Sequence, residues 1–482
     1  MQTIEEIVWQ HAAKIGNKVA VKSGRDVVTY GLLRAKMLAA AIYYKQLPGY
    51  ERGRAIVLAA GKQVEFLYAY FGAHLAGLTV APVAEDINPT RFEYIRKSID
   101  PIVAIGFDRI ETTVAKIPLS EFAGLKEGKA ALNTFPHSED IADILFTTGT
   151  TGAPKGVPLT FANELAAANQ INAFIRNQPE DVELLALPVS HSFGLGRLRC
   201  CLVNGQTIIL LGSFANVKRI FWTIEEERVA GFTMVPASWK FLQKMVGDRL
   251  SQFADQLKYI EMGSAYFSEE DKRHLAQLFP KTRVTMHYGL TEASRSAFME
   301  FHEDGAALSS VGKASPGVEI GIFDEEGKVQ PFDSEGEICV KGPHVMNGYL
   351  DVDNAQSFFG EYFRTGDCGK VTPEGYVYLK SRIKELINVG GKKVAPAEVD
   401  EQILKIPGVA DCACVGVPDP DGVLGEVVKG CVVRASDAEL TFDQIATALV
   451  GKLEPYKIPT VWQWIDAVPK THNGKIQRGL LK

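Results

Sequence analysis

Short apolar runs alternate with helix-like segments through about the first 310 residues, and this alternation limits the fold more than any other feature of the chain. The runs are typical of buried strands, and they include residues 55–58, 102–105, 184–187, 207–211 and 231–235. Segments such as Thr160–Phe174 and Glu269–Leu278 lie between them. Strands that alternate with helices favour parallel sheets with helices packed on their faces. The sequence therefore predicts an α/β fold with layered sheets up to about residue 310.

The pattern changes twice after that point. From about Gly312 to Leu379, short strand-like runs and turns indicate a small antiparallel barrel or sheet, and the last hundred or so residues read as a separate α+β unit. We predict a large N-terminal domain over 1–380, with two α/β subdomains to about 310 and a β-rich subdomain over about 311–380. A hinge at 381–384 and a mobile C-terminal lid domain at 385–482 complete the predicted order.

The composition narrows the class of function. Hydrophobic residues make up 46% of the 482 residues and charged residues 23%, which is typical of a soluble globular protein. The formal net charge of −6 offers no basic surface for nucleic acid. Seven cysteines without framework spacing indicate reduced thiols and a cytoplasmic location, and acidic residues follow Met1 where a signal peptide would be basic. The apolar stretch from Phe66 to Ala84 is broken by Gly77 and Pro82, so we expect a helix, a turn and a strand there rather than a membrane span.

A loop rich in Gly and Thr follows the strand-like run Ile144–Phe146 and ends at Val157. Its glycines let backbone N–H groups approach an anion, its hydroxyls add donors, and a lysine adds charge. The spacing is not that of the Walker loop. The loop is either a phosphate cradle of another kind or a surface turn. The residues of the cradle would be Thr147, Thr148, Gly149, Thr150, Thr151, Gly152 and Lys155.

Four further clusters carry groups suited to nucleotide chemistry. The segment His287–Ser294 combines an aromatic ring, a hydroxyl and a carboxylate, and Tyr362–Asp367 places a carboxylate on a turn. Val389–Glu398 contains a glycine pair, and Pro469–Arg478 presents a lysine on a turn. Taken alone, each cluster also reads as an ordinary surface turn.

Together with the loop, these clusters resemble the adenylate-forming superfamily of acyl-CoA synthetases, stand-alone adenylation domains and firefly luciferases over roughly residues 10–480. The resemblance implies that the loop wraps the phosphates of ATP, that Tyr288 stacks on adenine, and that Thr291 and Glu292 serve phosphate and Mg²⁺. It implies a hinge at Lys384 and a catalytic lysine at Lys475. The other residues that it implies for binding the nucleotide are Gly263, Ser264, Ala265, His287, Gly289, Asp367 and Arg382.

The chemistry of such an enzyme explains these residue types. A carboxylate attacks the α-phosphate of ATP and expels pyrophosphate, so cations must offset the charge that gathers there. The product, an acyl-adenylate, needs protection from water and then a thiol. A movable lid would supply Lys475 for the first step and a thiol tunnel at Gly390 and Gly391 for the second.

The acid is expected to bind near the segment 187–196. The resemblance implies that His191 gates the route between acid and thiol. Phe193 stands where amino-acid-activating relatives have an aspartate, which disfavours an amino-acid substrate. The acyl pocket would be lined by His191, Phe193, Gly194, Val235, Ser238, Ala265 and Gly289. Three nearby arginines, Arg197, Arg199 and Arg295, either pair with acidic residues, face solvent or clamp a second carboxylate; we favour a structural role.

The sequence thus predicts an ATP-dependent acid–thiol ligase that forms an acyl-AMP and then an acyl thioester, most simply an acyl-CoA from an aliphatic or aromatic carboxylic acid. One alternative is a ligase that loads the phosphopantetheine of an acyl carrier protein. Another is a nucleotide-binding relative without activity. The expected cofactors are ATP, Mg²⁺ and CoA or carrier-protein phosphopantetheine. The acid and the oligomeric state are left open.

Overall fold

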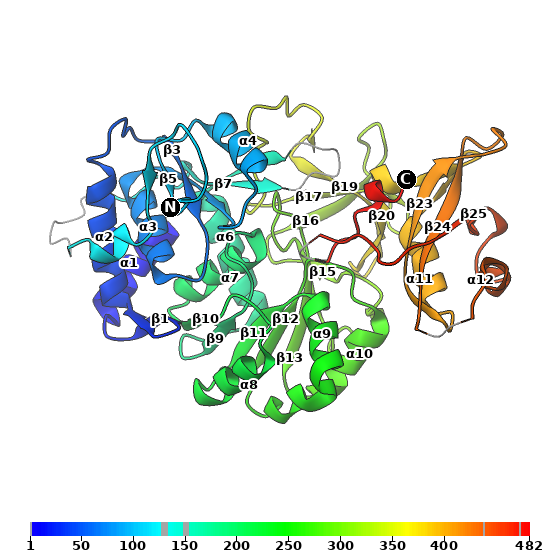
Figure 1. Cartoon of the computed structure of the whole chain (residues 1–482), viewed down its shortest axis with the longest axis horizontal. Helices are drawn as coiled ribbons and strands as arrows, with labels where there is room; N and C mark the ends of the chain where they lie inside the picture. The colour runs from blue at the N-terminus through cyan, green and yellow to red at the C-terminus, as the bar shows by residue number, and fades with distance from the viewer. Residues whose placement is uncertain (1, 127–133, 148–153, 437–438, 472–473) are drawn as a thin grey trace. The chain divides into compact units, whose positions relative to one another are not determined.

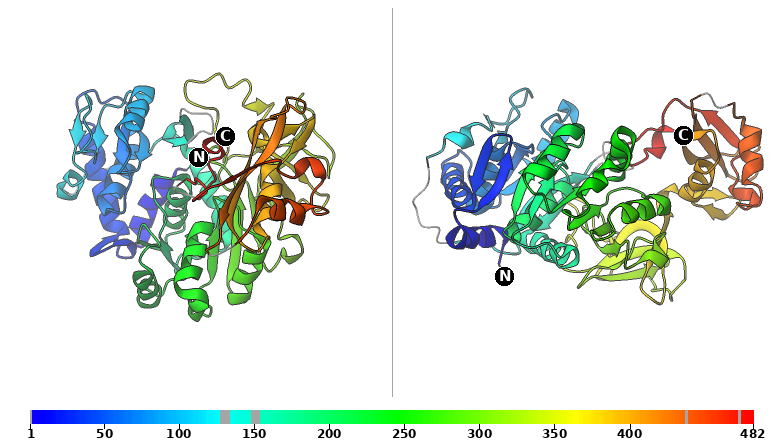
Figure 2. Two further views of the ribbon diagram at one scale, coloured as in Figure 1. Left: turned by 45° about the vertical axis from the view of Figure 1, so that its right-hand side comes forward. Right: turned by 90° about the horizontal axis from the view of Figure 1, so that it is seen from below.

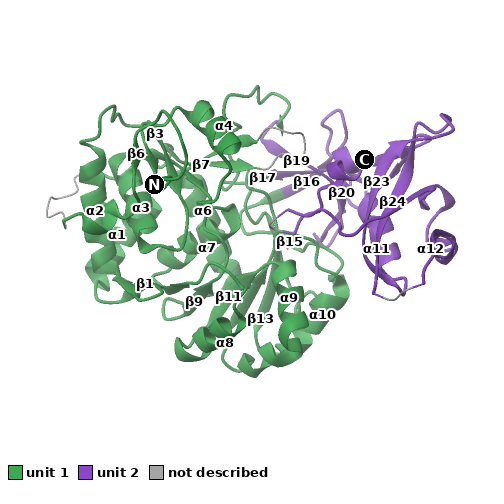
Figure 3. Ribbon diagram, in the orientation of Figure 1, with its two compact units in different colours: residues 1–319, 341–358 green, residues 320–340, 359–482 purple. Residues whose placement is uncertain are grey.

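The computed structural model describes residues 2–126, 134–147, 154–436, 439–471 and 474–482. The chain divides into two compact units (Figure 3): residues 1–319 with 341–358, and residues 320–340 with 359–482. Residues 359–380 thus group by compactness with the C-terminal part of the chain. The hinge at 381–384 stays a prediction about where the chain bends.

Within the described residues, the larger sheet of the first unit has nine strands, and its central part is parallel. Their order across the sheet is β15 (Lys313–Ala314), β14 (Ala297–Glu300), β13 (Arg283–Tyr288), β12 (Tyr259–Met262), β11 (Gly231–Met234), β9 (Val182–Leu185), β10 (Thr207–Leu210), β1 (Val19–Ser23) and β2 (Asp26–Thr29). Helices cover both faces, as the alternation in the sequence predicts. They are α6 (Phe161–Ile175), α7 (Ser192–Val203), α8 (Val217–Glu226), α9 (Pro236–Val246) and α10 (Glu269–Leu278).

Alternation along β12 and β13 divides their side chains between these two helical layers. Ile260 and Met262 belong to the apolar core that includes residues of α8, α9 and α10. Tyr259 packs instead with residues of α6 and α7. Because side chains alternate along a strand, Glu261 follows Tyr259 to that second face. The face toward α6 and α7 therefore receives the polar residues of these strands.

The second sheet of this unit has six strands in the described ranges, and it is parallel apart from the hairpin of β7 and β8. Their order is β6 (Lys116–Ile117), β5 (Ala104–Ile105), β3 (Ala55–Ala59), β4 (Thr79–Val83), β7 (Ile141–Thr147) and β8 (Lys155–Thr160). Helices α1, α2 and α3 pack against one another beside it (Figures 1 and 2). The helices here are α1 (Ile4–Lys14), α2 (Tyr30–Tyr44), α3 (Val64–Ala76), α4 (Pro89–Ile99) and α5 (Glu121–Gly124).

The apolar stretch at 66–84 has the predicted structure of helix, turn and strand. Helix α3 is buried apart from Glu65 in its first turn, and it ends at Gly77, whose left-handed φ of 79° suits glycine; β4 follows. In the part of the chain that the structure describes, no helix has the length and apolar character needed to cross a membrane.

The second unit joins an antiparallel sheet to an α+β segment. The sheet contains β16 (Glu319–Phe323), β17 (Gly336–Lys341), β18 (Phe358–Phe359), β19 (Tyr362–Val371) and β20 (Val377–Arg382). The α+β segment contains β21 (Ile387–Val389), β22 (Lys392–Val394), α11 (Pro396–Leu404), β23 (Val409–Pro418), β24 (Glu426–Arg434), α12 (Phe442–Leu449) and β25 (Val461–Trp464). Its core is formed by Val399 and Ile403 of α11 with Ile445 and Leu449 of α12 and the strands beneath them.

Short 3₁₀ turns occur in both units. The first unit contains η1 (Gly247–Phe253) and η2 (Gly305–Ala307), and the second contains η3 (Ile383–Glu385), η4 (Pro455–Lys457) and η5 (Arg478–Leu480).

Candidate active site

Four neighbouring strands of the large sheet end at the residues that the sequence assigns to acid and nucleotide. Strands β13, β12, β11 and β9 are adjacent and parallel. His191 follows β9, Val235 follows β11, the turn at 263–265 follows β12, and Gly289 follows β13. Since the carboxyl ends of parallel strands meet at one edge, these segments lie at the same edge of the sheet, where α/β proteins commonly bind ligands.

His287 links the turn after β12 to the start of α7. A Cβ on Gly263 would lie 2.1 Å from the His287 ring, so only glycine allows this approach. The His287 ring also packs edge-on against Phe193, with ring centroids 4.6 Å apart. The proposed nucleotide turn and the proposed acyl pocket are therefore in contact through one histidine.

The loop after β13 has little spare room. A Cβ on Gly289 would lie 2.4 Å from the backbone nitrogen of Arg295. Tyr288, the last residue of β13, is buried. In the turn after β12, Ser264 and Ala265 are half-buried, and Ser264 has a left-handed φ of 74°. Thr291 lies beside the start of α7, where its Oγ1 is 3.4 Å from the hydroxyl of Ser192.

Helix α7 is set by its first turn. His191 is its N-cap residue, and a Cβ on Gly194 would lie 2.3 Å from the carbonyl of Pro188. Phe193 is buried, while His191, Val235 and Ser238 are half-buried. A small cavity next to Ser192 and Thr291 offers ≈ 20 Å³ to the centre of a water molecule, which is room for about one water and not for an acyl chain.

The ends of the predicted phosphate loop lie on the β7–β8 hairpin. Thr147 pairs with Lys155 across it, and the Lys155 ammonium lies 4.3 Å from the centroid of the Tyr349 ring. Thr148, Gly149, Thr150, Thr151 and Gly152 lie outside the described residues.

The segment 345–350 brings Lys155 and Glu292 to the same tyrosine. Leu350 N–H donates to the carbonyl of Gly156 at 3.0 Å, and Met346 N–H donates to the carbonyl of Glu292 at 2.9 Å. Between these anchors, the Tyr349 hydroxyl donates to Glu292 Oε1 at 2.7 Å. The sequence reasoning missed Tyr349, since no motif marks it.

The buried carboxylate of Glu292 fits Mg²⁺. This ion prefers oxygen ligands and is usually held by one or two carboxylates together with substrate phosphates, rather than by a cage of protein ligands. No group of three or more His, Cys, Asp or Glu side chains in the described part of the chain is arranged to hold a metal. The seven cysteines, all within that part, are free thiols.

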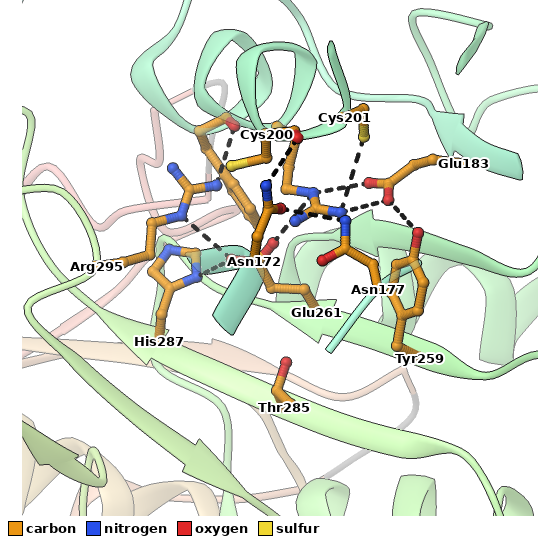
Figure 4. A network of polar contacts seen from close by, with 12 residues as sticks. Asn172, Asn177, Glu183, Cys200, Cys201, Tyr259, Glu261, Thr285, His287 and Arg295 are labelled. Atoms are coloured by element: carbon orange, nitrogen blue, oxygen red, sulfur yellow. Dashed lines mark hydrogen bonds and ion pairs between the residues drawn. The ribbon is translucent and has the colours of Figure 1, made fainter. Parts of the chain in front are cut away.

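The three arginines near the acyl pocket are paired with buried acidic residues, which confirms the structural role that we favoured. Arg197 Nε donates to Glu183 at 2.8 Å, Arg199 pairs with Asp143 and, at 2.8 Å, with Glu164, and Arg295 Nε lies 3.2 Å from Glu261. Figure 4 shows Glu183, Glu261 and Arg295 in one network of polar contacts with His287.

The second unit holds the remaining predicted residues. Asp367 on β19 and Arg382 on β20 face each other in the ladder, and their Oδ1 and Nε atoms lie 2.8 Å apart. Asp367 is buried, and Arg382 also donates to the carbonyl of Thr365 at 2.9 Å. This pair presents a carboxylate whose position is held by a guanidinium.

The hinge, tunnel and lysine residues are exposed in this unit. Lys384 lies in the 3₁₀ turn η3, and Gly390 and Gly391 form the turn between β21 and β22, with left-handed φ values of 56° and 85°. Lys475 is exposed near the C-terminal end, and its backbone N–H donates to Thr471 Oγ1 at 3.1 Å.

Comparison with known proteins identifies the family. The model of the AMP-binding enzyme family matches residues 8–350, and that of the AMP-binding enzyme C-terminal domain matches residues 398–475. A 2-succinylbenzoate–CoA ligase of Staphylococcus aureus (strain MW2) is 28% identical to the chain, over 98% of this chain and 99% of that protein.

Solved structures agree with this match. ATP-bound MatB from Rhodopseudomonas palustris has a TM-score of 0.89 and 27% identity, over 100% of this chain and 98% of its own. A fatty acyl CoA synthetase of Mycobacterium tuberculosis has a TM-score of 0.79 and 25% identity, over 99% and 97%. The predicted superfamily, the α/β fold class and the class of AMP-forming acid–thiol ligases are confirmed. The chain belongs to the AMP-binding enzyme family.

Proposed function

We propose that this chain joins a carboxylic acid to coenzyme A through an acyl-adenylate, at the expense of ATP. The observation that carries the proposal is the common edge at which β9, β11, β12 and β13 end, because it gathers the segments assigned to acid and nucleotide. Membership of the AMP-binding enzyme family supports ATP as the second substrate.

In this proposal, Lys155 and Glu292 serve the phosphates of ATP. Their common neighbour Tyr349 keeps the carboxylate in place. Mg²⁺ held by Glu292 would supply positive charge against the phosphate oxygens. Thr291 adds a hydroxyl at the start of α7, and the residues Thr147–Gly152 complete the cradle.

The nucleoside is assigned to two places in the chain. Tyr288, with His287, Gly289 and the turn at 263–265, would take the base, and the Asp367 carboxylate would accept hydrogen bonds from the ribose. Arg382 holds that carboxylate by the ion pair at 2.8 Å. We propose that the lid domain, turning about Lys384, carries Lys475 to the α-phosphate, where its ammonium offsets developing charge.

The acid is proposed to carry a single carboxylate on an aliphatic or aromatic body. Phe193 and Val235 supply apolar surface, and His191 gates the route to the thiol. Arg197, Arg199 and Arg295 are all buried and ion-paired with acidic residues. Releasing one of them to clamp a second carboxylate would leave a buried acid uncompensated, which is costly.

Coenzyme A is proposed as the thiol acceptor, because the curated relatives are named as CoA ligases. Gly390 and Gly391 would line its path, since a turn without side chains leaves space for a narrow pantetheine arm. The seven free thiols support a reducing compartment such as the cytoplasm.

The proposal is tested by acid-dependent exchange of pyrophosphate into ATP, without thiol, across a panel of acids. Benzoate, phenylacetate and straight-chain monocarboxylates are compared with succinate and 2-succinylbenzoate. We expect exchange with a monocarboxylate to exceed exchange with every dicarboxylate. Faster exchange with a dicarboxylate would overturn the assignment of the acid, and product formation with a holo-carrier protein but not with CoA would overturn the assignment of the thiol.

A further inference from the structure

Arg295 touches three segments of the proposed active site at once. Its Nε lies 3.2 Å from Glu261, which precedes the nucleotide turn by two residues. Its Nη2 donates to the carbonyl of Phe193 at 3.1 Å, and its Nη1 lies 3.4 Å from the carbonyl of Ser192. Its backbone nitrogen lies against Gly289, at the start of the loop that carries Thr291 and Glu292. The hydrogen bonds of the other two arginines near the proposed acyl pocket go elsewhere: Arg197 donates to Glu183, and Arg199 donates to the hydroxyl of Tyr70.

This guanidinium is held in a fixed place. Arg295 is 2% exposed and has a left-handed φ of 56°, which is unusual for a residue other than glycine. Its charge lies 4.7 Å from the centroid of the Phe193 ring. A Cβ on Gly196 would lie 2.7 Å from Nη1, so the glycine leaves room for the guanidinium beside α7.

Arg295 also shares an acceptor with His287. The Nδ1 atom of His287 lies 2.7 Å from Glu261 Oε1, the same oxygen that faces Arg295 Nε. The other charged groups around this histidine are Arg197 on α7, 3.7 Å from Glu261 Oε2, and Glu183 on β9, which pairs with Arg197. The rings of Phe193 and Phe298 pack edge-on against the imidazole.

In this cluster two carboxylates face two guanidiniums, so the charge is balanced while His287 is neutral. Burial lowers the pKa of His287 below its usual 6.5; the nearby carboxylate of Glu261 opposes this, and the charge of Arg295 reinforces it. Burial alone would raise the pKa of Glu261, but Arg295, His287 and Arg197 together lower it to about 2.

We propose that Arg295 is a positioning residue for the adenylation step, which holds the start of α7 against the nucleotide turn and the loop of Thr291 and Glu292. This inference rests on the proposed function. Arg295 acts through the carbonyls and the carboxylate that it binds, and it touches no substrate. By compensating Glu261 it also keeps His287 neutral beside the proposed base site.

Two substitutions separate the positioning of α7 from the effect on the protonation of His287. Arg295→Met removes both the charge and the fork of donors, whereas Arg295→Lys keeps the charge and loses the fork. With Arg295→Met, Glu261 is left with His287 as its nearest cation partner, so the histidine takes up a proton as the pH falls. With Arg295→Lys it stays neutral.

The experiment measures pyrophosphate exchange for both variants from about pH 8 to about pH 6, with the imidazole shifts of His287 followed by NMR. For Arg295→Met we expect kcat/KM for the acid to fall roughly 10–100-fold, with KM raised, because two or more charge-assisted contacts are lost. The ratio of its activity to that of wild type should fall toward low pH, because His287 gains a charge beside the proposed base site, and His287 should titrate at higher pH. For Arg295→Lys the activity should fall while the ratio stays flat.

Arg197→Gln is the comparison variant, because Arg197 is a fully buried arginine that also faces Glu261, at 3.7 Å, but donates to Glu183 and not to the backbone carbonyls of Ser192 and Phe193. It should lower the melting temperature and leave KM for acid and ATP within about twofold. The inference is wrong if Arg295→Met lowers the melting temperature but leaves both KM values within about twofold, or if His287 titrates in Arg295→Met as it does in wild type. If the wild-type protein shows no pyrophosphate exchange, the proposed function is contradicted. The NMR titration of His287 would still test the inference about Arg295.

Discussion

The hydroxyl of Tyr349 donates a 2.7 Å hydrogen bond to the carboxylate of Glu292. The two residues lie 57 positions apart, and they meet because the segment 345–350 is anchored to β8 at Gly156 and to Glu292 itself. The ring of Tyr349 also faces the Lys155 ammonium. One tyrosine thus orients the proposed metal carboxylate and contacts the lysine at the end of the phosphate loop.

Tyr349→Phe should weaken the use of Mg²⁺, because the carboxylate loses the partner that orients it. Loss of such a partner typically costs about 10–100-fold in metal affinity or activity. Pyrophosphate exchange measured against Mg²⁺ concentration should show this as a higher half-saturating concentration. Tyr94→Phe, at an exposed tyrosine of α4, serves as the control. An unchanged Mg²⁺ dependence in Tyr349→Phe would remove Tyr349 from the site.

Lys475→Ala should slow adenylation by about 10²–10³ and leave thioester formation from supplied acyl-AMP nearly intact, because its ammonium is needed only where charge develops on phosphate. Rapid-quench assays of each half-reaction measure this. Lys470→Ala is the matched control, since Lys470 is a lysine of the same C-terminal segment that pairs with Asp411. Equal losses in both half-reactions would show that Lys475 has another role.

Gly391→Trp should block thioester formation while pyrophosphate exchange continues. The added ring would fill the proposed path of the pantetheine arm, where no described atom lies within 4 Å of the point that a Cβ would occupy. Gly451→Trp is the control for backbone strain, because Gly451 also has a positive φ and open surroundings. Unimpaired thioester formation in Gly391→Trp would place the path elsewhere.

His74→Gln should destabilise the first unit. His74 is fully buried between Glu5 and Asp143, at 2.8 and 3.3 Å. Burial alone would lower its pKa, but hydrogen bonds to Asp143 and Glu5 raise it to about 10. Removing one partner from a buried ionic cluster typically costs about 3–5 kcal/mol of unfolding free energy.

The sign of the pH dependence follows from the raised pKa. The stabilisation by His74 is complete below 6.5, the unfolded value, and is lost as the pH rises through about 10. Urea unfolding of wild type and His74→Gln should therefore differ most at about pH 6.5 and converge as the pH rises through about 10. A difference that grows with pH would contradict a charged His74.

Local signals in the sequence were sufficient for many elements. The helix expected at 269–278 is α10, and the segment 160–174 lies within one residue of α6 at each end. The apolar stretch at 66–84 was interpreted correctly, since Gly77 ends the helix and Pro82 fits the strand that follows. The segments that follow β9, β11, β12 and β13 come together because the carboxyl ends of parallel strands meet at one edge of a sheet.

The partners of buried charges were not predictable. Arg197 and Arg199 lie on opposite sides of α7, so one pairs with β9 in the large sheet and the other with β7 in the second sheet. Arg295 pairs with Glu261, which lies 34 positions earlier in the chain. Helical and strand periodicity says which side chains are buried, but it does not say which element from a distant part of the chain lies opposite.

The most direct test of the central claim is a product analysis of wild-type protein with ATP, Mg²⁺, CoA and the acid that gives the fastest exchange. The account predicts AMP, pyrophosphate and acyl-CoA in equimolar amounts, with acyl-AMP accumulating when CoA is left out. Formation of ADP and phosphate that depends on the acid would contradict it.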